Sequence, residues 1–165
     1  MIETIPIKGL WGILSKLPGL FLKAFFPAQR LSQLIYVDLQ PRSDPAVVQL
    51  GQVATFTLYL QIINLSPFSV ELDRANFKFL FGGVSINTSI LKKQIIQAGE
   101  IATIYINDAI PDGHANQIAQ HHENSAALEG NIEFNCKVRS FAKNIGHLSG
   151  VNPRIYNANL RSQKQ

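Results

Sequence analysis

Histidines and carboxylates gather in one polar stretch of the sequence. The stretch contains five candidate metal ligands, which are Asp112, His114, His121, His122 and Glu123. Imidazole and carboxylate groups bind zinc, and three such ligands with a water would form a hydrolytic centre. The spacing matches no compact motif such as His-Glu-x-x-His, and histidines are common in polar surface loops. We therefore predict no metal site and no cofactor, and keep a metal-dependent hydrolase that uses residues 112–123 as an alternative.

Cys136 is the single cysteine of the chain, so an internal disulfide cannot form. A cysteine becomes a nucleophile when a histidine lies beside it. The alternation of the sequence instead places Cys136 on the same face as Phe134 and Val138, where a cysteine behaves as a small core hydrophobe. A phosphate-binding loop is also missing, because Gly82-Gly83 is followed by no Lys-Ser or Lys-Thr pair. We predict no catalytic residues and expect that the protein is not an enzyme.

The composition predicts one globular domain with a low content of charge. The chain has 165 residues, of which 46% are hydrophobic and 16% are charged, and this length can bury a core without disulfides or metals. Residues 1–30 hold four Lys or Arg against one Glu, a local charge of +3, whereas the remaining 135 residues hold eleven basic against ten acidic ones. Nucleic-acid-binding proteins spread basic groups over a folded face. We therefore expect no nucleic-acid partner.

Residues 5–26 predict a basic amphipathic helix, which Pro18 kinks. At about 100° per residue, the three lysines share one sector with Gly12, Ser15 and Gly19, while the apolar residues take the other side and Trp11 and Leu22 lie at its edge. The lysines argue against a membrane span, and such a helix instead lies in the membrane interface. The residues predicted to bind the membrane are Lys8, Leu10, Trp11, Leu14, Lys16, Leu17, Phe21, Lys23 and Phe25.

The same amphipathic pattern leaves three other interpretations open. The helix could pack on the protein's own domain, or against a partner protein. It could also be a signal peptide or signal anchor, although its start, Met-Ile-Glu, is acidic and no Ala-x-Ala cleavage site follows. We predict peripheral attachment to an anionic membrane surface on the cytoplasmic side, with a partner protein as the alternative.

Beyond residue 30 the sequence alternates with the period of two that is typical of half-buried β-strands. The longest such strand covers residues 53–63 and turns Ala54, Phe56, Leu58, Leu60 and Ile62 to one face. Further predicted strands cover residues 34–40, 68–73, 77–81, 84–88, 91–96, 101–107, 128–138 and 147–158. A short helix capped by Asp112 is predicted at 114–122. Asn64-Leu65-Ser66-Pro67 and Gly82-Gly83 predict tight turns.

These elements predict an all-β protein, an antiparallel β-sandwich of immunoglobulin or fibronectin type with an N-terminal amphipathic helical segment. The predicted organisation is a leader at 1–30, a sandwich domain at 31–160 and a polar tail at 161–165. If the strand at 128–138 lies at a sheet edge, its outward charges would also protect it from aggregation.

Several runs of the sequence resemble a known family. FTLYLQIIN leads into an Asn/Pro turn, FKFLFGGVSI ends a strand pair in glycines, QAGEIATIYI carries an Ala-Gly turn, and LEGNIEFNCKV is similar to the closing strands. In this order they resemble the late embryogenesis abundant group 2 domain, also called the water-stress and hypersensitive-response domain, over residues 50–160. The family commonly places Asn directly before Pro, whereas Leu65 and Ser66 intervene here.

The resemblance implies a fibronectin-like or immunoglobulin-like sandwich without catalytic residues. Members of the family are linked to stress tolerance or membrane-tethered roles, and some related domains are associated with lipid handling. We therefore predict a non-enzymatic binding or adaptor module at a membrane, with a stress-related role. A carrier of a lipid or other apolar ligand is the first alternative, because Phe77, Phe79 and Phe81 share one strand face.

Overall fold

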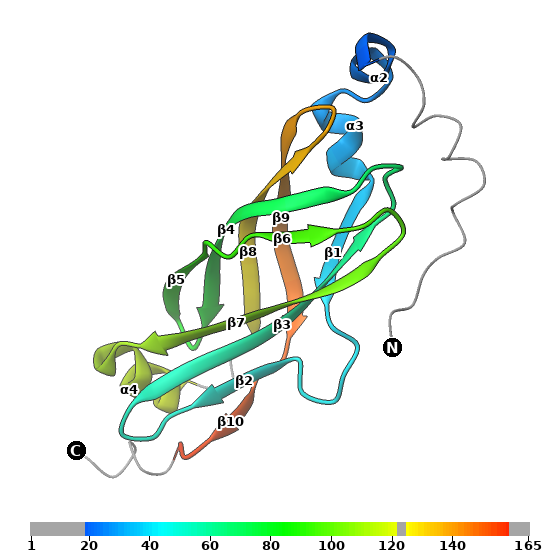
Figure 1. The fold of residues 1–165 in the computed structure, drawn as a ribbon. Coiled ribbons are helices and arrows are strands. Elements are labelled where there is room, and N and C mark those ends of the chain that lie inside the picture. Colours follow the sequence, from blue (N-terminus) through cyan, green and yellow to red (C-terminus); the bar gives the residue numbers. More distant parts are fainter. Residues whose placement is uncertain (1–18, 122–124, 159–165) are drawn as a thin grey trace.

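Two β-sheets pack face to face in the computed structural model, which describes residues 19–121 and 125–158 (Figure 1). The first sheet contains β1 (Ile35–Leu39), β2 (Ala46–Gln49), β3 (Ala54–Asn64), β7 (Ile101–Ile110) and β10 (Arg154–Tyr156). The second sheet contains β4 (Val70–Phe81), β5 (Val84–Ile90), β6 (Gln94–Ile96), β8 (Ala126–Cys136) and β9 (Ser140–Val151). The predicted all-β sandwich is thereby confirmed.

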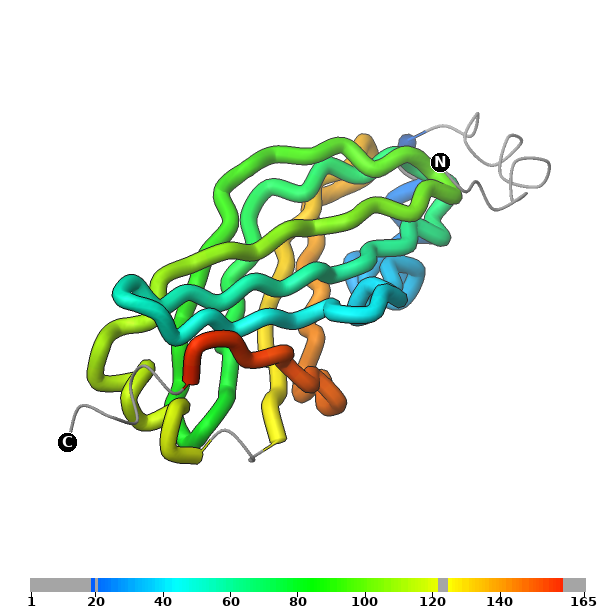
Figure 2. The backbone as a smooth tube through the Cα atoms, turned by 90° about the horizontal axis from the view of Figure 1, so that it is seen from below, coloured from blue at the N-terminus to red at the C-terminus, as the bar shows by residue number. Residues whose placement is uncertain are grey.

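Long central strands organise both sheets. In the first sheet, β3 pairs with β7 along one edge and with β1 and β2 along the other. In the second, β4 pairs with β8 along one edge and with β5 and β6 along the other, and β9 lies beyond β8. All pairs are antiparallel except β10 with β2, which is parallel. Figure 2 shows the strands of the first sheet side by side, with β10 (red) next to β2.

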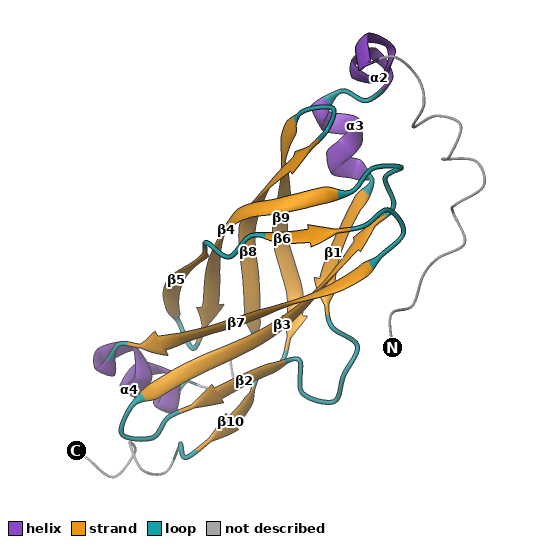
Figure 3. Ribbon diagram, viewed as in Figure 1, coloured by secondary structure: helices purple, strands orange, loops and turns teal. Residues whose placement is uncertain are grey.

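Three short helices lie at the ends of the sandwich (Figure 3). Helices α2 (Gly19–Phe25) and α3 (Ala28–Gln33) lie at one end, and α4 (Asp112–Gln120) lies at the other. The residue that precedes α4 is Pro111, and no side chain caps the helix. The predicted cap at Asp112 is therefore wrong. Asp112 lies instead in the first turn, where a carboxylate favours the positive end of the helix dipole.

The core lies between the two sheets, and the alternation in β3 places it there. Every second residue of β3, from Ala54 to Asn64, is buried. Phe56 on this strand stacks on Phe79 of β4, with ring centroids 5.2 Å apart and an angle of 18° between the rings. The five residues predicted to face the core are all buried.

Two strands that the sequence predicted separately, at 68–73 and 77–81, form one strand, β4, which contains a β-bulge. β4 is continuous from Val70 to Phe81, but its pairing with β8 shifts register between Leu72 and Arg74. A bulge adds one residue to one strand, so the buried side chains change from even to odd positions, from Leu72 to Ala75. The change of phase made one bent strand look like two in the sequence.

The end of the chain departs from the predicted strand at 147–158, because it forms two strands. β9 begins already at Ser140 and pairs with β8, and β10 pairs with β2 in the other sheet. Gly150 has a φ of 79°, and Pro153 has no N–H to donate to a sheet. The chain crosses between the sheets at this point. As a result β8 lies between β4 and β9, not at the edge that was considered for it.

The Gly82-Gly83 turn makes a testable prediction about local backbone strain. Both residues have a positive φ, 60° and 77°, as the tight turn of a β-hairpin requires. A Cβ at residue 82 would lie 2.9 Å from the Cα of Ile118 in α4, whereas one at residue 83 would meet only the Gln117 side chain, at 3.2 Å. We expect Gly82→Ala to lower the free energy of unfolding by about 2–4 kcal/mol and Gly83→Ala by about 1–2 kcal/mol. Urea unfolding measures both, and equal losses would contradict the close packing of α4 on this turn.

Candidate functional site

Helix α2 divides its apolar side chains between the core and the solvent. Leu22 and Phe26, the residue directly after the helix, are 5% and 4% exposed and belong to the core of the sandwich, whereas Phe21 and Phe25 are 59% and 54% exposed. Side chains four residues apart lie on the same helix face, so each pair forms a face of its own. One face holds α2 to the sandwich, and the other is bare.

The inward face of α2 packs on the turn between β3 and β4. The rings of Phe26 and Phe68 meet edge to face, with centroids 5.0 Å apart. The guanidinium of Arg30 lies 5.7 Å from the Phe26 ring, and the ammonium of Lys137 lies 5.1 Å from the Phe68 ring. Leu31 of α3 is fully buried and belongs to the same hydrophobic core. Aromatic and aliphatic contacts thus anchor both helices to this end of the sandwich.

Basic side chains from the β8–β9 hairpin bind the ends of the two helices. Arg139 donates from Nη2 to the carbonyl of Lys23 at 2.7 Å, and Lys143 donates from Nζ to the carbonyl of Ser32 at 3.1 Å. Arg30 donates from Nη1 to the carbonyl of Phe25 at 3.2 Å. The last carbonyls of a helix have no partner within the helix, and cations there favour the helix dipole. These contacts fix the orientation that leaves Phe21 and Phe25 exposed.

Asn64 supports this end of the molecule from inside. Its side chain is fully buried, and Nδ2 lies 2.8 Å from the carbonyl of Phe68 and 3.0 Å from the carbonyls of Ile96 and Gln97. Its Oδ1 accepts hydrogen bonds from the N–H and the hydroxyl of Ser66, at 3.0 and 2.6 Å. The predicted Asn-Ser turn is confirmed, and one amide joins the β3–β4 turn to the β6–β7 turn.

The charge around the exposed phenylalanines is positive. Lys23 and Lys137 are exposed, Arg30 is exposed, and α2 and α3 contain no acidic residue. Of the residues predicted to bind a membrane, Phe21, Lys23 and Phe25 all lie exposed on α2. The other six lie outside the described residues, and these are Lys8, Leu10, Trp11, Leu14, Lys16 and Leu17. Among the helices that the structure describes, none has the length and apolarity to cross a bilayer.

The histidines near α4 do not form a metal centre within the described residues. Asp112 and His114 belong to α4 and His121 follows it, whereas His122 and Glu123 lie outside the described part of the chain. In residues 19–121 and 125–158, no three His, Cys, Asp or Glu side chains come close enough together to hold a metal ion. Cys136 is half-buried against the core, and its thiol donates to the carbonyl of Arg139 at 3.3 Å.

A small cleft lies between the two sheets, where β7 of the first sheet faces β5 and β6 of the second. Leu72, Ile90 and Ile104 line this cleft together with Lys92, and its volume is about 200 Å³. Ligand pockets commonly hold about 300–1,000 Å³. The phenylalanines that suggested a lipid site, Phe77, Phe79 and Phe81, are buried and fill the core.

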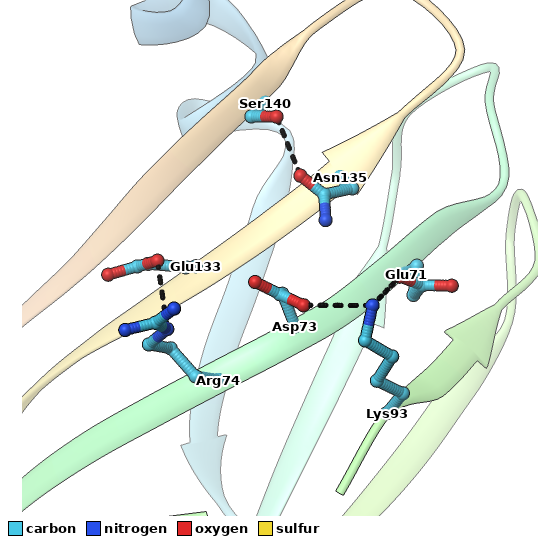
Figure 4. A network of polar contacts seen from close by, with 7 residues as sticks. All are labelled: Glu71, Asp73, Arg74, Lys93, Glu133, Asn135 and Ser140. Carbon is cyan, nitrogen blue, oxygen red and sulfur yellow. Dashed lines mark hydrogen bonds and ion pairs between the residues drawn. The ribbon is translucent and has the colours of Figure 1, made fainter. Parts of the chain in front are cut away.

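The outer face of the second sheet carries a network of charges (Figure 4). The ammonium of Lys93 lies 3.2 Å from carboxylate oxygens of both Glu71 and Asp73, and Arg74 lies 3.4 Å from Glu133. Hydrogen bonds to Asp73 and Glu71 raise the pKa of Lys93, and the bond to Asp73 has the larger effect. Exposed ion pairs of this kind contribute little to stability. The network is typical of a solvated sheet face.

The fold places the chain in the class of immunoglobulin-like β-sandwiches. No family model matches the sequence, and no curated protein matches it. Among solved structures, the X-ray structure of Northeast Structural Genomics Consortium target SoR45 is similar over 70% of this chain and 84% of that one, with 11% identity and a TM-score of 0.51. The solution structure of AT1g01470 from Arabidopsis thaliana is similar over 68% of this chain and 80% of that one, with 14% identity and a TM-score of 0.47. The likeness to SoR45 shows a shared fold.

Proposed function

We propose that the protein is a non-enzymatic binding module that attaches to an anionic membrane surface through the outer face of α2. The observation that carries the proposal is the exposure of Phe21 and Phe25 on α2, while Leu22 of the same helix and Phe26, which follows it, are buried in the core. Interfacial helices insert aromatic side chains below the lipid headgroups while their basic residues meet anionic lipid. The hydrogen bond from Arg139 to the carbonyl of Lys23 holds α2 in this orientation, and the bond from Lys143 to the carbonyl of Ser32 holds the neighbouring α3.

The energetics of this face suit reversible attachment. Fully burying a phenylalanine contributes about 1.5–3 kcal/mol, and Phe21 and Phe25 each have roughly half of their surface to bury. Each basic group near an anionic surface adds about 1 kcal/mol, and Lys23, Arg30 and Lys137 are exposed to solvent. The total is several kcal/mol. The predicted amphipathic helix at residues 5–26 would add further contacts of the same kind.

We also propose that the chain is a distant relative of the late embryogenesis abundant group 2 domain, with a stress-related role at the membrane. Two of the turns that carry the resemblance have defined structural roles here. Asn64 links two turns through its side chain, and Gly82 allows α4 to approach the β4–β5 hairpin. The small cleft between β7 and the β5–β6 segment does not favour a lipid carrier. Two of the five candidate metal ligands of the hydrolase alternative, His122 and Glu123, lie outside the described residues.

Co-sedimentation with vesicles tests the proposed membrane attachment. We expect the full chain to pellet with phosphatidylserine-containing vesicles and to remain in the supernatant with pure phosphatidylcholine. Replacing both exposed phenylalanines, Phe21→Ser with Phe25→Ser, should lower the partition coefficient about 10- to 100-fold, because about 1.4–2.8 kcal/mol of burial is lost.

The matched control is Leu91→Ser with Ile95→Ser, which removes two exposed apolar side chains, one directly after β5 and one in β6. This variant should bind anionic vesicles as the unmodified chain does. The proposal fails if the unmodified chain stays in the supernatant with anionic vesicles. It also fails if the control variant loses as much binding as the phenylalanine variant.

A further inference from the structure

The four tyrosines of the sequence all lie on one surface, the outer face of the first sheet. Tyr36, Tyr59, Tyr105 and Tyr156 come from β1, β3, β7 and β10, at strand positions whose neighbours turn inward. All except Tyr59 are exposed, and Tyr59 is half-buried. Figure 1 shows the described helices at the ends of the sandwich, none of them over this sheet. We call this surface the Tyr face.

The register of the strands spreads the tyrosines over the whole face. Tyr59 lies opposite Tyr105, with ring centroids 5.2 Å apart. Tyr36 of β1 is paired with Ile63 of β3, which lies four residues after Tyr59. Tyr156 of β10 is paired with Gln49 of β2, and Gln49 is paired with Thr55 of β3, which lies four residues before Tyr59. Four residues of strand span about 14 Å. The tyrosines are therefore distributed along about 27 Å of the sheet.

The composition of the Tyr face is that of a protein interface. The five strands of the first sheet contain no lysine and no glutamate, whereas in the second sheet β4 contains both types, β8 contains two glutamates and β9 contains a lysine. Arg42 stacks on Tyr59 at 3.9 Å, and Arg154 lies 5.4 Å from the Tyr156 ring. Protein interfaces are enriched in tyrosine and arginine and depleted in lysine and glutamate. The contrast lies within a single chain, since the opposite sheet carries the charged network of Figure 4.

The charges on the Tyr face allow it to pack against the same face of a second copy of the chain. Arg42 and Arg154 are balanced by Asp38 and Asp44, of which Asp44 lies 3.2 Å from Arg154 and Asp38 accepts a hydrogen bond from Tyr36 at 2.6 Å. A neutral surface with both signs and with paired donors and acceptors complements itself about a two-fold axis. A membrane or a nucleic acid would instead require a basic surface.

The size of the Tyr face also fits a dimer. β3 has 11 residues, about 37 Å of strand, and three to four strands at about 4.8 Å give a surface of the order of 500–700 Å². A standard interface buries about 800 Å² on each partner. Loop residues such as Arg42 extend the surface toward that value.

We propose that the Tyr face packs against the Tyr face of a second copy of this chain and forms a two-fold symmetric dimer. In this dimer the first sheets of both copies stack as sheets do in a sandwich, about 10 Å apart. The tyrosine rings interdigitate in the centre, and each arginine meets an aspartate of the other copy at the rim.

Sedimentation equilibrium of the full chain at micromolar concentration tests the dimer. We expect twice the chain mass of 18.3 kDa. Tyr105→Lys should raise the dimer dissociation constant at least about tenfold, because an unpaired charge would be buried in the interface. Tyr36→Lys is a second variant with the same expected effect, and circular dichroism checks that both variants are folded. Asn131→Lys, on the outer face of the second sheet, is the matched control and should leave the mass unchanged.

Two further outcomes separate the dimer from the membrane proposal. The Phe21→Ser with Phe25→Ser variant should remain a dimer, and the Tyr105→Lys variant should still bind anionic vesicles. A monomeric mass for the unmodified chain at 100 µM would overturn the dimer. So would a dimer that persists in both lysine variants, or one that dissociates when the α2 phenylalanines are replaced.

Discussion

Asn64→Ala is expected to lower the free energy of unfolding by about 3–5 kcal/mol, because each buried polar group that loses its partner costs about 1–3 kcal/mol. The two hydrogens of Nδ2 serve two buried carbonyls and the partly buried carbonyl of Gln97, and Oδ1 accepts from the N–H and hydroxyl of Ser66. Alanine would leave these groups without the side chain that satisfies them. Urea unfolding monitored by circular dichroism measures the loss.

Gln61→Ala is the matched control for Asn64, since it lies on the same strand but faces outward. Its expected effect is within about 0.5 kcal/mol. A loss below about 1 kcal/mol for Asn64→Ala would show that the turns are held by the backbone alone. The bonds Asn64 N–H to Glu100 carbonyl and Gly99 N–H to Asn64 carbonyl would then be sufficient.

Phe79→Ala is expected to cost about 3–5 kcal/mol of unfolding free energy, the range for truncating a buried aromatic side chain. Phe79 is fully buried, stacks on Phe56 across the two sheets and lies 5.9 Å from the ring of Phe81. Interiors are close-packed, so the neighbours cannot fill the cavity completely. Urea unfolding measures the change, and the slope of the unfolding free energy against urea concentration is compared between the variant and the unmodified chain.

Phe21→Ala is the control for Phe79, because this phenylalanine is exposed on α2 and its loss should change stability by less than about 0.5 kcal/mol. A double-mutant cycle of Phe56→Ala and Phe79→Ala should show a coupling of about 0.5–1.5 kcal/mol. If Phe79→Ala costs less than about 1 kcal/mol, the space between the sheets is loosely filled. That result would bring back the interpretation of the sandwich as a carrier of apolar ligands.

The structure supports one interpretation of the leader directly, because Leu22 of α2 and the next residue after the helix, Phe26, pack on the domain itself. Phe21 and Phe25 are exposed on the same helix, and these are the side chains that we propose to enter a membrane. This division explains why the stability and vesicle experiments must use different residues. Substitutions at Leu22 would unfold the helix end, whereas substitutions at Phe21 leave the fold intact and report on binding.

The sequence alone determined the local structure of this protein. The period of two in β3 identified its core residues, and Asn64, Gly82 and Gly83 identified turns, because strand alternation and turn chemistry depend on neighbouring residues. The prediction of strand boundaries failed in two segments. The bulge at β4 changed the phase of one strand, and the chain from Ser140 to Tyr156 divided between two sheets.

Only the tertiary structure decided which surfaces are free. A helical wheel places Phe21, Leu22 and Phe25 all at or near the apolar side, and packing against Phe68 through Phe26 selects which of them are buried. The four tyrosines are separated by up to 120 positions in the chain, and strand pairing alone brings them to one face. Such pairings depend on contacts between distant residues, on which the local pattern of a sequence carries little information.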